Sequence, residues 1–522
     1  MPDHIYEKKD LVQRFDNILG QKLGKIDNVG MFEHVQDFNL QKGVAGAVIE
    51  QCVLGYPPDS KQEADLIIID EEKQTKTELK TTGMVINEDH YVAKEPMSIT
   101  AVGVYDLADQ EFNSSHFWEK LEHMLIVYYH YASDHPVTPY EYRHFPVVGY
   151  EFHEFSDIEI ETLRTDWEHV RALVQRVVSH HPGVHDAAWK NAVREEYIEV
   201  HGELRRLLSY IDLAPKFPPR FRLKKPTVST MIAKHFGYDL EQLPGRYATI
   251  SDIDIKCREL TSIYAGRTIR EIAKEFDIDV FSKRGEDKKA IAEQIIISMF
   301  GGKSKKLNQI EEFQKFGIIA KSVVMTSTGG RTEDMKLFHV DFDEFTRTEV
   351  EAEDGSMRAI EFEDSELYSY FANHEFLCIL FEEPAATFLE RTNSVDYFIQ
   401  NRNLADNRFF GFKRLTFSDE FIDTTVRRLW DDVRDKVMNK KLKDIIQRNA
   451  DGTEKRIKAD NSISSAPNFM KSSHNEVFLR GSGSDSALIH KTECVNGIRM
   501  LPQYVWIKGT SIVDELLKSE KI

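Results

Sequence analysis

Cysteine is scarce in this sequence: its four copies, Cys52, Cys257, Cys378 and Cys494, are spread over 522 residues. No two of them form a C-x-x-C pair, so the sequence indicates neither a zinc site nor a disulfide framework. Long apolar runs are missing too, since none approaches the ~18–20 residues of a membrane span. The amino-terminal segment MPDHIYEKKD has no apolar signal region. We therefore expect a cytoplasmic globular protein.

Positive charge is in deficit as well, because 87 acidic residues outnumber 68 basic ones and leave a formal net charge of −19. This balance argues against a protein that coats nucleic acid non-specifically, since such proteins gain affinity by neutralising phosphates. It leaves open a cleft with a positive lining of its own. The segment KFPPRFRLKK at 216–225 holds five basic residues and no acid, although such clusters are more often plain basic surface than a groove.

What the sequence does contain is a pair of carboxylates and a lysine. Asp65 is followed, after twelve residues, by Glu78-Leu79-Lys80. If 77–81 is a strand, its alternation places Glu78 and Lys80 on one face and Leu79 on the other, toward the core. Two carboxylates bind Mg²⁺ through oxygen and a nearby ammonium can position water, which outlines a metal-dependent phosphodiesterase. Alone, such a triplet is more often a solvated strand face.

The two halves of the chain repeat one another. The helical pattern AVIEQCVLGY at 47–56 recurs as AIAEQIIISMF at 290–300, and SHFWEKLEHMLIVYY at 115–129 resembles SELYSYFANHEFLCILF at 365–381. A repeat of this length predicts two copies of one fold.

The set of Asp65, Glu78 and Lys80, in contrast, is complete only in the first copy. When TELKTTGM at 77–84 is aligned with GIIAKSVVMT at 317–326, Lys321 matches Lys80. Asn308 and Ile319 then stand where the first copy has Asp65 and Glu78. The fold therefore does not require these carboxylates, and their retention in the first copy favours a functional role.

A set of motifs in a fixed order carries a family resemblance. KGVAGAVIEQCVLGY, the DLIII…ELKTT hairpin, SHFWEKLEHML, DWEHV, HGE and PPRFRLKKPTVSTMIAKHF resemble the motifs of the mismatch-repair nickase MutH and of the GATC-cutting type II restriction endonucleases related to it. The resemblance covers residues 20–238 and, more faintly, 262–517. The two-copy layout is similar to the restriction enzymes and differs from the single-domain nickase.

This resemblance implies an α/β protein with two tandem restriction-endonuclease-like domains, each a mixed β-sheet flanked by helices. Residues 1–240 would form the catalytic domain, 241–249 a linker, and 250–522 a degenerate domain that binds DNA or regulates the first.

The resemblance also implies roles for single residues. Asp65 and Glu78 match the metal-binding carboxylates, and Glu50 matches a helical acid that completes the metal site. Lys80 matches the catalytic lysine, and Lys120 a second functional lysine. The implied cofactor is Mg²⁺.

Other positions match residues that contact DNA. Lys42 lies where the family places a phosphate-contacting lysine, and the DNA-facing segment is matched by Arg220, Arg222 and Lys224. Arg222 replaces a tyrosine that the family links to adenine methylation, so the methylation response stays open. The loop that reads bases after HGE is shortened in this copy, which weakens the inference of GATC specificity.

The second copy has a long segment at 477–493 in the corresponding place. Its Arg480 either contacts a guanine bidentately or belongs to a solvated surface loop; the sequence leaves both readings open. Small residues such as those in GSGSDS give this segment the composition of a loop.

We therefore predict a type II site-specific endonuclease that hydrolyses phosphodiester bonds of double-stranded DNA with Mg²⁺, at GATC or a related short site, in defence against foreign DNA. The protein would act as a monomer or as a transient dimer on DNA. Two alternatives stay open: a strand-specific nickase of mismatch repair, and a catalytically inert DNA-binding protein.

Overall fold

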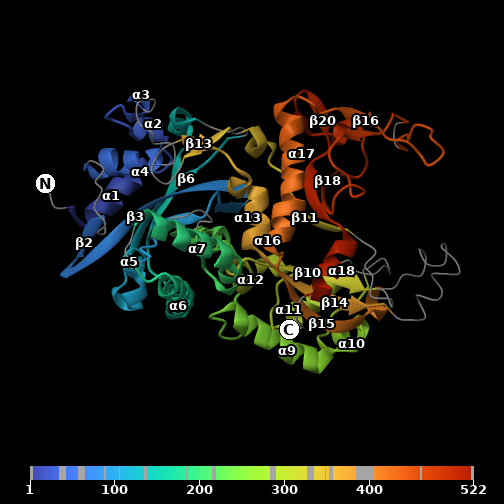
Figure 1. The fold of residues 1–522 in the computed structure, drawn as a ribbon, viewed down its shortest axis with the longest axis horizontal. Coiled ribbons are helices and arrows are strands. Elements are labelled where there is room, and N and C mark those ends of the chain that lie inside the picture. Colours follow the sequence, from blue (N-terminus) through green and yellow to red (C-terminus); the bar gives the residue numbers. More distant parts are fainter. Residues whose placement is uncertain are drawn as a thin grey trace. The chain divides into compact units, whose positions relative to one another are not determined.

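The computed structural model divides the chain into two compact units (Figure 1). Unit 1 comprises Met1–Asp254, Phe300–Ile319 and Glu351–Arg358, and unit 2 comprises Ile255–Met299, Ala320–Val350 and Ala359–Ile522. The structure describes residues 4–34, 43–56, 65–87, 90–104, 106–133, 138–183, 186–213, 219–281, 290–325, 334–346, 348–351, 357–383, 404–458 and 461–518. In these ranges no helix is long and apolar enough to span a membrane. The four cysteines are free, as their spacing predicted.

Unit 1 is built on a mixed six-stranded sheet with the order β1-β2-β3-β6-β7, in which β4 also pairs with β3 (Figure 1). The strands are β1 (Ile5–Glu7), β2 (Leu66–Asp70), β3 (Lys73–Asn87), β4 (His90–Ala93), β6 (Met124–His130) and β7 (Val147–His153). β1–β2 and β3–β6 are parallel, whereas β2–β3, β3–β4 and β6–β7 are antiparallel. The mixed sheet and the β2–β3 hairpin confirm the predicted fold class for this half.

Helices pack on this sheet according to the alternation of its side chains. The helices of unit 1 are α1 (Lys8–Ile18), α2 (Leu23–Ile26), α3 (Met31–His34), α4 (Val44–Val48), α5 (His116–Glu119), α6 (Asp157–His180), α7 (Ala187–Leu207), α8 (Lys225–His235) and α12 (Glu311–Lys315). A π-helix, η1 (Ile49–Leu54), continues α4. Leu79, Leu125 and Val127 join α1, α4 and η1 in one apolar core. Tyr128 points the other way, and its ring lies 5.2 Å from that of His235 on α8.

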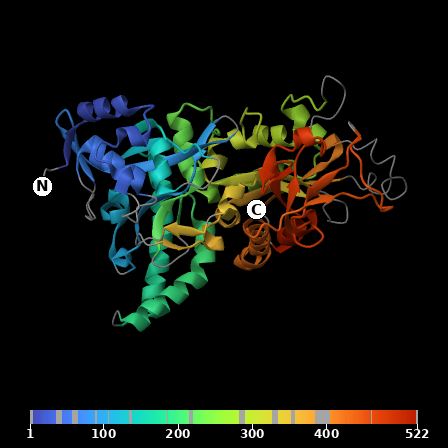
Figure 2. The ribbon, with the colours of Figure 1, turned by 90° about the horizontal axis from the view of Figure 1, so that it is seen from above.

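The helices α6 and α7 form an antiparallel pair, visible as two long neighbouring helices in Figure 2. His180 and His181 at the end of α6 contact Glu196 of α7 at 2.7 and 2.6 Å. Both helices are amphipathic, since each buries one face and exposes the other.

A second, three-stranded sheet completes unit 1. Its order is β5 (Met97–Ala101), β9 (Arg220–Leu223) and β8 (Ile211–Leu213), all antiparallel. Asp166 of α6 is buried and accepts the N–H groups of Ser209, Tyr210 and Ile211 at 2.6–3.1 Å. Burial raises the pKa of this carboxyl to about 6, although the three N–H donors lower it. Asp166 thus fixes the start of β8 on α6.

The second half of the chain has helices and sheets of its own. Its helices are α9 (Ile250–Tyr264), α10 (Ile269–Glu275), α11 (Ile291–Met299), α13 (Glu366–Asn373), α16 (Asp419–Phe421), the π-helix η9 (Ile422–Val426), α17 (Arg427–Met438) and α18 (Gly509–Lys518). One sheet is β10 (Ile318–Met325), β14 (Glu375–Glu382) and β15 (Arg408–Leu415), and another is β11 (Met335–His339), β21 (Gln503–Ile507) and β18 (Val477–Gly481). Three two-stranded pairs are β12 (Glu349–Glu351) with β13 (Met357–Ala359), β16 (Asp444–Ile446) with β17 (Ser465–Pro467), and β19 (Glu493–Val495) with β20 (Ile498–Met500).

Matching hydrogen bonds support the repeat that the sequence predicted. Gly20 follows α1 and donates its N–H to the carbonyl of Val147 on β7 at 2.7 Å. Gly266 follows α9 and donates its N–H to the carbonyl of Phe409 on β15 at 2.8 Å. Both glycines have a left-handed φ, +75° and +83°, which other residues rarely adopt. The same turn therefore closes the first helix onto the sheet in each copy.

The copies differ after α11. Where the first copy has β2, the second forms the 3-10 turn η5 (Leu307–Gln309) and helix α12, and this segment belongs to unit 1. Asn308, which the alignment set opposite Asp65, lies in η5. The carboxylate of Glu241 accepts the N–H groups of Lys303 and Ser304 at 2.6 and 2.5 Å. The segment 241–249, predicted as a linker, thus lies within unit 1.

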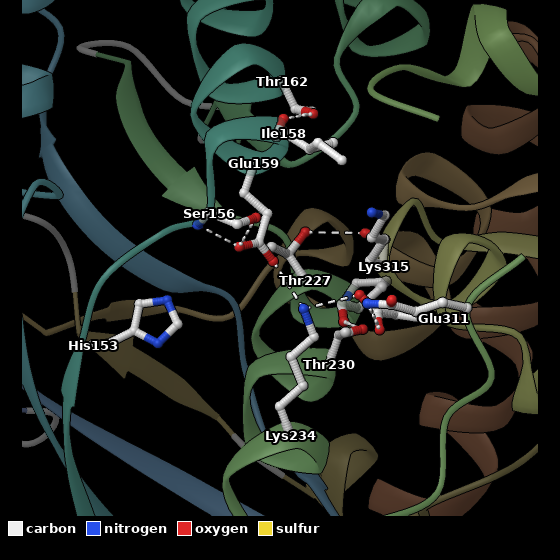
Figure 3. A network of polar contacts seen from close by, with 12 residues as sticks. His153, Ser156, Ile158, Glu159, Thr162, Thr227, Thr230, Lys234, Glu311 and Lys315 are labelled. Atoms are coloured by element: carbon white, nitrogen blue, oxygen red, sulfur yellow. Dashed lines mark hydrogen bonds and ion pairs between the residues drawn. The ribbon is translucent and has the colours of Figure 1, made fainter. Parts of the chain in front are cut away.

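Helix α12 is held to α6 and α8 by a polar network (Figure 3). The ammonium of Lys234 on α8 lies 3.0 Å from the carboxylate of Glu159 and 2.8 Å from that of Glu311. The Thr227 hydroxyl donates to the backbone carbonyl of Lys315 at 3.2 Å. Glu311 and Lys315 are both buried, so these charges depend on their partners in the network.

Candidate active site

The β2–β3 hairpin brings the two predicted metal carboxylates together. Leu66 pairs with Thr77 in this antiparallel ladder, so Asp65 comes opposite Glu78 at the adjacent position. The Oδ2 atom of Asp65 accepts the backbone N–H of Leu79 at 2.9 Å. Leu79 itself is buried in the core, which confirms the predicted alternation of β3.

Two lysines hold the Glu78 carboxylate. The Nζ atom of Lys80 lies 2.8 Å from Oε1, and the Nζ atom of Lys120 lies 2.8 Å from Oε2. The side chains of Glu78, Lys80 and Lys120 are 5%, 17% and 9% exposed. Ion pairs this well shielded from water interact far more strongly than surface pairs.

The helix α5 and the following turn deliver Lys120 to this site. The Ser115 hydroxyl caps α5 by accepting the N–H of Trp118 at 3.1 Å, and Lys120 is the residue at the other end of the helix. β6 then starts at Met124, which pairs with Glu78 in the parallel β3–β6 ladder. The short path between helix and strand therefore sets Lys120 beside Glu78.

The second copy keeps the cap and changes the lysine. Ser365 caps α13 by accepting the N–H of Tyr368 at 3.0 Å. Counted from these caps, Tyr370 stands where the first copy has Lys120. Lys321, aligned with Lys80, donates instead to the backbone carbonyl of Lys336 at 3.4 Å. The second copy has thus replaced the acids and redirected or lost both lysines.

The electrostatics of the first-copy site are those of a crowded carboxylate pair. Burial and then the neighbouring Glu78 carboxylate raise the pKa of Asp65 to about 6, while the Leu79 N–H, Lys120 and Lys80 act in the opposite direction. Ionised Asp65 is therefore unfavourable in this environment. A bound cation would relieve this repulsion.

Asp65 and Glu78 suit a hard divalent cation, because such ions prefer carboxylate oxygens. Among the described residues, however, no three His, Cys, Asp or Glu side chains gather closely enough to hold a metal ion. Glu50, the predicted third ligand, lies on η1 and is part of no such group. Each Glu78 oxygen contacts one ammonium group and has a second lone pair, which a cation can use.

The predicted DNA-contacting residues of the first copy have diverse surroundings. Arg222 forms a bidentate pair with Asp212 at 2.9 and 2.8 Å, and Arg220 is half-buried on the same strand. Lys224 is buried and its ammonium donates to the carbonyl of Leu208 at 2.5 Å, so in this arrangement it points inward. Lys42 lies outside the described residues.

Sequence reasoning missed Asp212, the partner of Arg222. The signal was present, because Asp212 is the single acid in the apolar run SYIDLA. A buried carboxylate requires a partner, and the alternating arginines of RFRL were the available cations.

Arg480 lies on strand β18, in a segment whose composition resembled that of a loop. Its guanidinium stacks between the rings of Phe478 and Trp506, 4.9 and 4.8 Å from their centres, and pairs with Asp334 at 2.7 Å. Residues 482–492 form irregular chain with the 3-10 helix η10 (Leu488–His490), and Glu493 begins β19. Strand pairing with β21 explains the difference, because long-range contacts override local composition.

Two comparisons with known proteins agree with this geometry. Residues 54–166 match the family model of the DNA mismatch repair enzyme MutH, a range that contains Asp65, Glu78, Lys80 and Lys120. The type II restriction enzyme Sau3AI of Staphylococcus aureus is 22% identical over 392 residues, which cover 72% of this chain and 71% of that enzyme. The resemblance predicted from the motifs is thereby confirmed: residues 54–166 match the MutH family model, and the chain is similar over most of its length to a type II restriction enzyme.

Proposed function

We propose that this chain is a type II restriction endonuclease that hydrolyses phosphodiester bonds of double-stranded DNA with Mg²⁺ and acts in the cytoplasm against foreign DNA. The observation that carries the proposal is the convergence of Asp65, Glu78, Lys80 and Lys120 in unit 1. Two carboxylates and two ammonium groups in a shielded site are suited to phosphoryl chemistry. The fold does not require them, since the second copy folds without them.

Each residue has a distinct part in this reaction. Asp65 and Glu78 would hold the cation, with Glu50 as a further acid. Bound Mg²⁺ supplies Lewis acidity toward the scissile phosphate and its water. Lys80 orients the attacking water through its ammonium, and Lys120 offsets the negative charge that develops on the phosphate oxygens. Because both lysines are fixed by Glu78 beforehand, little reorganisation is needed when DNA binds.

Replacement of Glu78 by Gln tests this proposal. Cleavage of supercoiled plasmid in Mg²⁺ should fall by roughly 10³-fold or more, because a ligand and the anchor of both lysines are lost. DNA affinity, measured by fluorescence anisotropy, should change by less than about threefold, as few phosphate contacts are affected.

The matched control is Asp70→Asn, which removes an exposed carboxylate at the turn of the same hairpin. It should leave cleavage intact. Undiminished Mg²⁺-dependent cleavage by Glu78→Gln would show that the activity resides elsewhere, and a wild-type protein that binds DNA without cutting it would favour the inert DNA-binding alternative.

The recognition site proposed is GATC or a related short sequence, which rests on the similarity of motifs and on the kind of enzyme that Sau3AI is. The shortened region before β9 and the Arg222–Asp212 pair depart from the family pattern. Sequencing of the ends of cleaved plasmid DNA reports the site and the stagger directly. Cleavage without a common sequence at the ends would reject site specificity.

For the second copy we propose a role in DNA binding or regulation, with Arg480 as a contact residue. The stacking of Arg480 on Phe478 and Trp506, and of Lys336 on Tyr504 with 3.4 Å from Nζ to the ring centre, gives β11-β21-β18 a cationic and aromatic side. Cations and aromatic rings together are typical of nucleic-acid-binding surfaces. If Arg480→Ala leaves affinity and sequence preference unchanged, Arg480 has no such role.

A further inference from the structure

A polar groove of about 480 Å³ lies next to the proposed active site of unit 1. One wall is the start of β3, including Lys73, Thr75 and Lys76, and the other is α5 with the turns that flank it, including Ser114 and Glu119. The groove is open to solvent and its walls carry charged and hydroxyl groups. Nothing in the roles proposed above uses these residues.

The groove exists because β3 is longer than its neighbour. The β3–β6 ladder begins where Glu78 pairs with Met124, and the N–H of Glu78 donates to the carbonyl of His123 at 2.9 Å. The preceding residues of β3, 73–77, pair with β2 on one side. Their other side forms the groove wall, so the groove runs directly up to the Glu78 position.

Lys76 is the cation best placed to act there. Side chains alternate along β3, so Lys76 shares its face with Glu78 and Lys80. Two residues along a strand correspond to about 7 Å, which is one to two nucleotide steps along a DNA strand. A phosphate held by Lys76 would therefore be a near neighbour of a phosphate at Glu78 and Lys80.

Lys76 is engaged by an exchangeable partner. Its ammonium lies 3.1 Å from the Glu119 carboxylate, and the two side chains are 64% and 35% exposed. His116 lies 3.7 Å from the other oxygen of Glu119. Exposed ion pairs of this kind contribute at most about 1 kcal/mol, so a phosphate can take the place of Glu119 at small cost.

A further cation lies beside the groove. The Asn113 side chain, which lines the groove, accepts a hydrogen bond from Arg164 at 3.0 Å. The Arg164 guanidinium also stacks on Phe112, 4.5 Å from the ring centre. With Lys73 and Lys76, this arrangement sets three positive groups at the groove, whose lining also includes the acids Glu119 and Glu122.

We propose that this groove binds the sugar–phosphate backbone of the DNA strand beside the scissile phosphate, with Lys76 as the phosphate-binding cation and Glu119 as the carboxylate that the phosphate displaces. The proposal rests on the nuclease function proposed above and deepens it by assigning the path of the substrate strand. The ligand is the backbone and not a base, because lysine ammonium and hydroxyl donors recognise phosphate irrespective of sequence.

The test measures binding of a duplex that contains the mapped cleavage site, without divalent cation and over a series of KCl concentrations. Lys76→Ala should weaken binding about tenfold and reduce the slope of log affinity against log salt by about 0.9, the value for one phosphate contact. Glu119→Gln should tighten binding about twofold to threefold, because it frees Lys76. If this ion pair only stabilised the fold, replacing Lys76 or replacing Glu119 would change the DNA affinity in the same direction.

The matched control is Lys8→Ala, which removes an exposed lysine of the same unit that pairs with Asp70 at 2.6 Å and does not line the groove. It should leave the salt slope unchanged. If Lys76→Ala behaves like Lys8→Ala, or if Glu119→Gln weakens binding, the groove is not the strand path.

The two proposals fail separately. If Lys76→Ala and Glu119→Gln leave binding unaltered while Glu78→Gln abolishes cleavage, the groove assignment is wrong and the nuclease stands. If Glu78→Gln still cleaves while the two groove variants shift affinity in opposite directions, the catalytic assignment is wrong and the groove stands. A wild-type protein that neither binds nor cuts DNA overturns both.

Discussion

At the scale of single residues, the ionised Asp65 carboxylate destabilises the folded protein. Its pKa rises from 3.8 to about 6, mainly through burial and also through Glu78. In the window between these values the folded protein binds more protons at Asp65 than the unfolded chain does. The free energy of unfolding therefore falls as the pH rises from about 4 to about 6 and stays reduced above it.

Asp65→Asn should remove this cost. The amide oxygen can still accept the N–H of Leu79, while the charge that repels Glu78 is absent. At neutral pH the variant should be more stable by about 1–3 kcal/mol, the shift in pKa converted and reduced for partial exposure. The measurement is the melting temperature of both proteins from pH 4 to pH 8.

The difference in melting temperature should grow up to about pH 6 and then remain constant, while cleavage is lost at every pH. A difference that does not depend on pH would mean that the carboxylate of Asp65 is not under electrostatic strain. Stability gained at the expense of activity is the usual consequence when a catalytic charge is removed.

The sequence predicted the part of this site that follows from local patterns, and not the part that depends on long-range contacts. The period of a strand was enough to put Glu78 and Lys80 on one face and Leu79 in the core. The contact between Glu78 and Lys120 joins positions 42 residues apart, and no local pattern contains it; the family resemblance alone indicated Lys120. The inward direction of Lys224 likewise depends on Leu208, a distant residue.

At the scale of secondary-structure elements, helix α12 is the feature that the sequence did not predict. It comes from the repeat that aligns with β2, yet it packs on α8 of unit 1. The β2–β3 hairpin was predicted correctly because its pattern is local. The position of α12 in the fold was not predicted, because it depends on whether Glu311 and Lys315 find partners on another helix.

Lys234 should be the residue on which this packing depends. Lys234→Met removes the cation that contacts both Glu159 and Glu311, and unit 1 should lose about 2 kcal/mol of unfolding free energy, less than for a fully buried pair because the Lys234 side chain is 40% exposed. The measurement is chemical denaturation at neutral pH, followed by hydrogen exchange of α8 and α12.

The control for this change is Lys256→Met, which removes the partner of Glu259 in a more exposed pair at 2.9 Å on α9. It should cost no more than about 0.5 kcal/mol. Equal effects of the two substitutions would mean that the network of Figure 3 contributes no more than an ordinary surface ion pair.

At the scale of the whole molecule, the chain combines a duplicated fold with an asymmetric site. The first unit is not contiguous, because Phe300–Ile319 belongs to it. Deletion of 250–522 would therefore strip α12 from α8 and destabilise the first copy, so single substitutions such as Arg480→Ala are the sharper probe of the second. The sequence predicted the repeat. It did not predict that Phe300–Ile319, from the second copy, belongs to unit 1.

The asymmetry leads to a prediction about the products. Each chain holds the Asp65–Glu78 carboxylate pair once, since Asn308 and Ile319 stand in their places in the second copy. A double-strand break then needs two chains on one DNA molecule or two successive nicks by one chain. Adding a tenfold excess of Glu78→Gln protein to the wild type distinguishes the two, with nicked and linear plasmid measured over time.

If two chains meet on DNA, most pairs that contain an active chain will also contain an inactive one, and nicked plasmid should accumulate several-fold relative to linear plasmid. If one chain nicks twice, the inactive protein only competes for DNA, and the ratio of nicked to linear product at equal conversion should stay unchanged. Nicked plasmid that never becomes linear, even with wild-type protein in excess, would instead identify a strand-specific nickase.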